Sequence, residues 1–179
     1  MHKILGSWSG MRKDLEQEML AESLRGRVRY NSTSFPGMDG CRLFEIYLDG
    51  ALAKRFAWET VNSDFIRRGK KERTDPHGTM EYWAEFWPTL SRIPVQEREE
   101  HTDGEFCDAL ERYRNQPIAD SLESENPLER MFAILDRRVG KRRLAAISKT
   151  VEQQPQWLKR FYRLRLEAEG IPVEKSTNR

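Results

Sequence analysis

The sequence predicts an α+β fold, with a three-stranded antiparallel meander near the N-terminus and a mainly helical C-terminal half. Apolar and polar residues alternate between residues 27 and 57, which is the period of half-buried strands. Within this stretch Asp49-Gly50 indicates a hairpin, because both central residues of the favoured two-residue turn need positive φ. From residue 126 onward apolar residues recur every three or four positions, which is the helical period. A sheet of three strands needs a helix on one face.

A first helix is expected over residues 11–24, with Ser9 as its N-cap and Gly26 ending it. Trp8 precedes the cap and can pack back onto the helix. One face of this helix carries Met11, Leu15 and Met19. This helix is the candidate to cover the sheet.

Strands are expected at residues 27–34, 41–48 and 51–57, with a turn-rich loop over residues 35–40. In the third strand, alternation places Leu52 and Phe56 on one face.

Helices are expected next at residues 58–68, 79–87 and 104–114. The second of them ends at Pro88, and its predicted buried face consists of Met80, Trp83, Ala84 and Trp87. Residues 91–103 are expected to form a polar connector, with Asp103 as the N-cap of the third.

The C-terminal helices have stronger end signals. Asn126 is the expected N-cap of a helix that starts at Pro127 and ends with Gly140 in the left-handed conformation. Two further helices are expected over residues 141–150 and from Pro155 to Gly170. Residues 1–172 are predicted to be one domain and residues 173–179 a flexible tail.

Charge is segregated along the chain, although the net charge is only +2. Residues 94–129 hold eleven acids and three bases, a net charge of −8. Residues 137–165 hold ten bases and one acid, a net charge of +9. Such segments either meet in the fold or present opposite surfaces to partners.

Two arginines in the basic segment, Arg138 and Arg165, are predicted to point into apolar helix faces. A buried guanidinium needs a carboxylate or carbonyl partner, so each either pairs internally or lines a site for an anion. The internal acids considered are Asp136, Glu129 and Glu167. The helix start at Lys141, Arg142 and Arg143 is a further candidate for binding an anion or a partner.

No catalytic set, cofactor motif or complete metal-ligand set is recognisable in the sequence. His101, Asp103 and Glu105 alternate in a loop, which is a weak metal signal. Cys41 and Cys107 lack metal-ligand spacing and are expected to be reduced thiols. No signal peptide or membrane-spanning run is recognisable, so a cytoplasmic location is expected.

Five stretches of the chain carry a resemblance. They are WSGMRKDLE, SLRGRVRYNSTSF, RLFEIYLDG, NPLERMFAILDRRVGKRRL and LKRFYRLRLEAEGI. In these stretches the chain resembles an uncharacterised family of small bacterial cytosolic proteins, whose most specific block here is LDRRVGKR at residues 135–142. The resemblance implies a single-domain bacterial protein and supplies no catalytic residue.

Three function hypotheses follow from these features. The first is a non-enzymatic protein-interaction module, such as an adaptor or immunity-like binder, because aromatic residues are many and charge is segregated. The second is nucleic-acid binding through residues 137–165. The third is an enzyme for an anionic substrate, with Arg138 and Arg165 as clamps and Glu105 or Glu129 as base.

Overall fold

The computed structural model describes residues 7–34, 42–70 and 80–173. Within them the chain forms three strands, β1 (Val28–Ser34), β2 (Arg42–Leu48) and β3 (Ala51–Phe56). The α-helices are α1 (Trp8–Lys13), α2 (Trp58–Arg67), α3 (Met80–Arg92), α4 (Asp103–Asn115), α5 (Ile118–Glu123), α6 (Pro127–Leu135), α7 (Lys141–Ile147) and α8 (Gln156–Ala168). Short helical turns occupy Asp14–Glu18, Glu22–Leu24, Val95–Glu97 and Ser148–Gln153. The predicted loop at residues 35–40, Cys41 and the predicted tail beyond Val173 lie outside the described residues.

The sheet confirms the predicted antiparallel meander, in the order β1-β2-β3. Asp49 and Gly50 adopt φ values of 49° and 81°, as the tight hairpin between β2 and β3 requires. On the sheet's polar face, Glu45 accepts hydrogen bonds from Arg55 and Asn31 on the neighbouring strands and from Tyr47 on its own strand. The apolar face is buried against helices, which gives the alternation its physical cause.

One prediction for β3 is wrong. A register shift in the β2–β3 ladder places Ile46 opposite Lys54 and Tyr47 opposite Leu52. The extra residue reverses the phase of the alternation, so Leu52 is exposed while Lys54 and Phe56 are buried.

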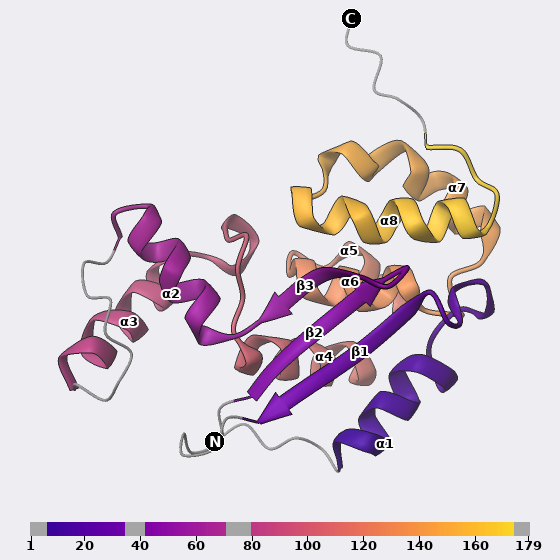
Figure 1. Ribbon diagram of the computed structural model, residues 1–179. Helices are drawn as coiled ribbons and strands as arrows, with labels where there is room; N and C mark the ends of the chain where they lie inside the picture. The colour runs from indigo at the N-terminus through magenta and orange to yellow at the C-terminus, as the bar shows by residue number, and fades with distance from the viewer. Residues whose placement is uncertain (1–6, 35–41, 71–79, 174–179) are drawn as a thin grey trace, which may run out of the picture.

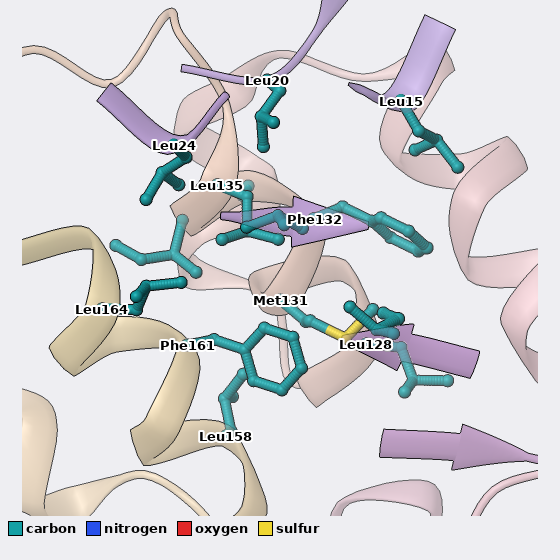
Figure 2. Packing of buried hydrophobic residues seen from close by; sticks show 14 of the residues in the cluster. Leu15, Leu20, Leu24, Leu128, Met131, Phe132, Leu135, Leu158, Phe161 and Leu164 are labelled. Carbon is teal, nitrogen blue, oxygen red and sulfur yellow. The ribbon is translucent and has the colours of Figure 1, made fainter. Parts of the chain in front are cut away.

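The main core lies between the sheet and α4, α6 and α8 (Figure 1). Phe106 of α4 connects these layers, since it packs on Phe44 and Phe56 of the sheet and on Phe132 of α6. Figure 2 shows leucines of the N-terminal segment meeting side chains of α6 and α8 in the same cluster. The apolar side chains Leu128, Met131, Phe132 and Leu135 of α6 are buried, and so is Val139 after its end.

The N-terminal helix differs from the prediction. Its N-cap is Ser7, not Ser9, because the Ser7 hydroxyl accepts a hydrogen bond from the Gly10 amide at 3.2 Å. The regular helix stops at Lys13, and the chain then forms backbone hydrogen bonds with the segment after α6. Backbone groups that form those hydrogen bonds cannot also form the hydrogen bonds of an α-helix, so no single helix spans residues 11–24.

Helix ends in the second half also shift. The N-cap of α4 is Thr102, not Asp103, and Thr102 forms a reciprocal capping box with Glu105. The helix α6 ends at Leu135 rather than at Gly140. Gly140 has a φ of −79° and caps the start of α7, so it is not in the left-handed conformation.

Helices α2 and α3 form a lobe beside the sheet (Figure 1) with its own small cluster of buried residues. That cluster consists of Trp58, Val61, Phe65, Tyr82 and Phe86. Pro88 does not end α3, which continues to Arg92. Because Pro88 is on the exposed side, the carbonyl it leaves without a helical partner faces water.

None of the helices in the described part of the chain has the length and apolar character needed to cross a lipid bilayer.

Candidate interaction surface

Arg165 is buried, as the sequence predicts for a residue on the apolar face of α8. Its side chain is only 3% exposed. The guanidinium donates to Glu169 at 2.6 Å, to the Ser23 hydroxyl at 2.8 Å and to the Val139 carbonyl at 3.0 Å. Glu169 thus takes the role for which Glu167 was considered. Arg165 joins three segments, and its partners are all internal.

Arg138 lies after the end of α6, not on its apolar face. It forms a bidentate ion pair with buried Asp136. Its guanidinium carbon lies 5.7 Å from the ring centre of Tyr113. The hydrogen bonds to Asp136 raise the pKa of Arg138 above its ordinary value. About half of the Arg138 side chain is exposed, whereas Asp136 is buried, so this ion pair lies where the core meets the surface.

Lys141, Arg142 and Arg143 are exposed in the first turn of α7. Among the residues that the structure describes, these three have no ion-pair partner, and the same holds for exposed Arg137. Four exposed bases without an ion pair therefore lie close together in the chain within residues 137–143, while exposed Lys149 and Arg160 lie outside this stretch. Arg165 does not belong to this surface.

Glu105 and Glu129, the two candidate bases, each form an ion pair with a different arginine. Glu105 pairs with Arg98 and closes the capping box of α4. Glu129 accepts from Arg112 and Gln116; burial opposes ionisation, but these donors lower its pKa. Among the described residues, Glu105 and Glu129 share no hydrogen-bond partner with Arg138 or Arg165.

His101, Asp103 and Glu105 also turn to separate partners. The His101 ring is fully buried, 5.4 Å from the ring centre of Trp157, and contacts the Val95 carbonyl. Asp103 accepts from the Arg42 amide. Across residues 7–34, 42–70 and 80–173, no group of three or more His, Cys, Asp or Glu side chains is arranged to hold a metal.

Cys107 is a half-buried free thiol in α4. Burial, reinforced by Asp103 and Asp108, raises its pKa to about 12. It therefore stays protonated at neutral pH and lacks the thiolate that a nucleophile needs.

Lys54 is a buried charged residue that the sequence-based predictions do not include. Its ammonium group donates to the Glu99 carbonyl and to Glu100, and lies 4.9 Å from the ring centre of Trp157. Lys54 lines a cleft of about 280 Å³ between β3, α2 and the start of α8. The available signal was its position two residues from Phe56, on the inward face of a strand.

The outer face of α3 carries the residues that the sequence predicts to be buried. Met80 is 87% exposed and Trp87 is 52% exposed, with Ala84 exposed between them and Trp83 half-buried beside them. The four residues do share a face, but Tyr82 and Phe86 are the fully buried side chains of α3, and Trp83 packs only partly buried against the same cluster. We call Met80, Trp83, Ala84 and Trp87 the α3 face.

The aromatic side chains of the α3 face are held in place by their neighbours. Trp87 stacks on Trp83, with ring centres 5.7 Å apart, and meets Phe86 edge-on at 5.1 Å. Trp83 in turn contacts Trp58 of α2 at 5.2 Å. The α3 face is thus a pre-ordered apolar surface attached to a packed lobe.

Comparison with known proteins gave one match. A search of curated proteins and a search of solved structures found no match to the chain. A profile of the SF0329 protein family matches residues 7–166, which is most of the chain and includes the sheet, the α2–α3 lobe and nearly all of α8. The chain belongs to the SF0329 protein family.

Proposed function

We propose that this protein is a protein-interaction module that binds its partner through the α3 face. The observation that carries the proposal is the exposure of Met80 and Trp87 on one side of a helix whose other side is packed. Large exposed apolar side chains that adjoin one another mark interaction sites in soluble proteins. The same proposal includes a bacterial, cytoplasmic protein that acts as an adaptor or an immunity-like binder.

Tryptophan is well suited to anchor such a contact. It buries a large area on association and is enriched among residues that dominate binding energy. Trp87 is already stacked on Trp83. A side chain ordered before binding loses less conformational entropy on association, which favours affinity.

Site-specific photo-crosslinking in living cells tests the proposal. A photoreactive amino acid replaces Trp87 in one variant and Arg29, exposed on β1, in a control variant. We expect position 87 to give a discrete protein adduct that position 29 does not give. The adduct is then identified and its binding reconstituted from purified chains. Equal background labelling at both positions would refute the proposal.

Nucleic-acid binding is the second candidate, favoured by the exposed bases Arg137, Lys141, Arg142 and Arg143. Binding through phosphate contacts weakens steeply as salt increases. We expect the triple variant K141Q/R142Q/R143Q to lower the affinity and reduce the salt dependence. No retention of the wild-type chain on DNA or RNA at low salt would remove this candidate.

A further inference from the structure

We infer that Lys54 is a reactive amine that forms an imine with a small uncharged aldehyde or ketone held in the cleft beside β3. The inference goes beyond the proposed use of the α3 face and involves none of its residues. The Lys54 side chain is only 4% exposed. It is nevertheless one of the residues that line the cleft of about 280 Å³, so a small molecule in the cleft lies beside it.

The surroundings of the Lys54 amine make it easier to deprotonate than the amine of an exposed lysine. Its Nζ lies 4.9 Å from the ring centre of Trp157 and 5.9 Å from that of Phe56. Burial lowers the pKa of Lys54, although the charges of Glu100, Glu99 and Asp64 act in the opposite direction. A lysine desolvated in this way has a larger unprotonated fraction at neutral pH, and the unprotonated nitrogen is the nucleophile.

Glu100 is placed to move protons in the reaction. Its Oε2 accepts a hydrogen bond from Nζ of Lys54 at 3.3 Å. Its side chain is 34% exposed, and Glu100 also lines the cleft. A carboxylate within hydrogen-bond reach of the reacting nitrogen can take a proton from it and deliver a proton to the carbonyl oxygen.

Imine formation needs no reactant besides the amine and the carbonyl compound. The lone pair of Nζ attacks the carbonyl carbon, a C–N bond forms, and one proton moves from the nitrogen to the oxygen, which gives a carbinolamine. The hydroxyl group and the remaining proton on the nitrogen then leave as water, and the C–N bond becomes the C=N bond of the imine.

The walls of the cleft favour a small and uncharged compound. The cleft volume of about 280 Å³ lies just below the range of roughly 300–1,000 Å³ that is usual for ligand pockets. Leu52 and Trp157 offer apolar surface to a short hydrocarbon chain. Glu99 and Glu100 lie on the same walls, so a carboxylate on the compound would meet like charges there.

Reductive trapping on the wild-type chain tests the inference. The probe is propanal, and cyanoborohydride reduces any imine to a stable propyl-lysine that peptide mass spectrometry locates. In the folded chain at neutral pH we expect Lys54 to be modified about tenfold faster than Lys141 and Lys149, which are exposed in the same chain. In the urea-unfolded chain all three lysines should react equally fast, because only the fold supplies the cleft and lowers the pKa of Lys54.

Two results would overturn the inference. One is modification of Lys54 in the folded chain at or below the rate of Lys141 and Lys149. The other concerns the class of compound and uses glyoxylate, a small aldehyde that carries a carboxylate. With each rate divided by the rate at Lys141, faster trapping of glyoxylate than of propanal at Lys54 would contradict an uncharged compound. Neither result depends on the crosslinking at position 87.

Discussion

The guanidinium of Arg165 is buried among hydrogen-bond acceptors from three segments of the chain. Removing it in R165A leaves the Val139 carbonyl without this donor and Glu169 without its positive partner, with the Ser23 hydroxyl still donating to Glu169. Breaking a buried ion pair in this way costs about 3–5 kcal/mol of unfolding free energy. Urea denaturation followed by circular dichroism measures the loss. R163A, whose side chain is half exposed and pairs with Glu152, should cost below about 1 kcal/mol. Equal losses in the two variants would contradict the structural role of Arg165.

His101 gives the stability of the fold a pH dependence. Burial, together with the nearby charges of Lys54 and Arg98, lowers its pKa well below 6.5. The unfolded chain therefore binds a proton more readily than the folded one, and stability falls as pH drops below about 6.5. From pH 7.5 to 5.5 we expect a loss of about 1.4 kcal/mol from this group.

The difference between the wild type and H101Q isolates the histidine contribution. Burial raises the pKa of Glu59, which acts in the opposite direction, but this term is common to both chains. Denaturant titrations at the two pH values should show a smaller pH effect in H101Q. The same pH effect in both chains would rule out His101 as its source.

At the scale of elements, the α2–α3 lobe has a much smaller core than the rest of the molecule. Among the described residues its cluster contains five buried side chains, whereas α6 alone buries eight residues. Regions with few buried contacts open locally at lower free energy than the main core. We expect amides near Phe86 to exchange with deuterium at least tenfold faster than amides near Ile134.

Native-state hydrogen exchange followed by mass spectrometry makes that comparison. It also bears on the prediction that residues 1–172 form one domain. Equal protection at Phe86 and Ile134 would mean that the lobe opens only with the whole molecule, contrary to our expectation.

The elements that the sequence predicts well are those with local signals. The strands follow from period-two alternation and from the left-handed turn at Asp49-Gly50, both of which are readable in a few residues. The face of α3 could not be oriented in this way. Periodicity indicates that Met80 and Trp87 share a face, but only packing against α2 decides which face is covered.

A similar limit applies to β3 and to the candidate site residues. The single extra residue in β3 reverses the alternation, so Leu52 becomes exposed although it was predicted to share a face with Phe56. The sequence correctly singles out Arg165 as buried, but its Ser23 and Val139 partners come from distant segments. Contacts of that kind depend on the tertiary arrangement, which periodicity does not contain.

At the scale of the whole molecule, the basic segment is partly neutralised from within. Its ion pairs include Arg138 with Asp136, Arg163 with Glu152 and Arg165 with Glu169. In the described part of this segment, the exposed bases without an ion pair include four in the stretch 137–143, together with Lys149 and Arg160 further along the chain. The apolar counterpart is the α3 face, which lies on the lobe beside the sheet (Figure 1). The molecule therefore presents an apolar surface and a basic surface on different elements.

Hydroxyl-radical footprinting of Met80 and Trp87, with the purified chain alone and with the partner that the crosslink at position 87 identifies, tests the central claim most directly. In the chain alone both side chains should be oxidised rapidly, because both are exposed. Leu52, exposed on β3 away from the α3 face, serves as the internal reference. We predict that the partner slows the oxidation of Met80 and Trp87 severalfold and leaves that of Leu52 unchanged. Unchanged oxidation of all three residues in the presence of the bound partner would contradict the claim that the α3 face is the binding surface.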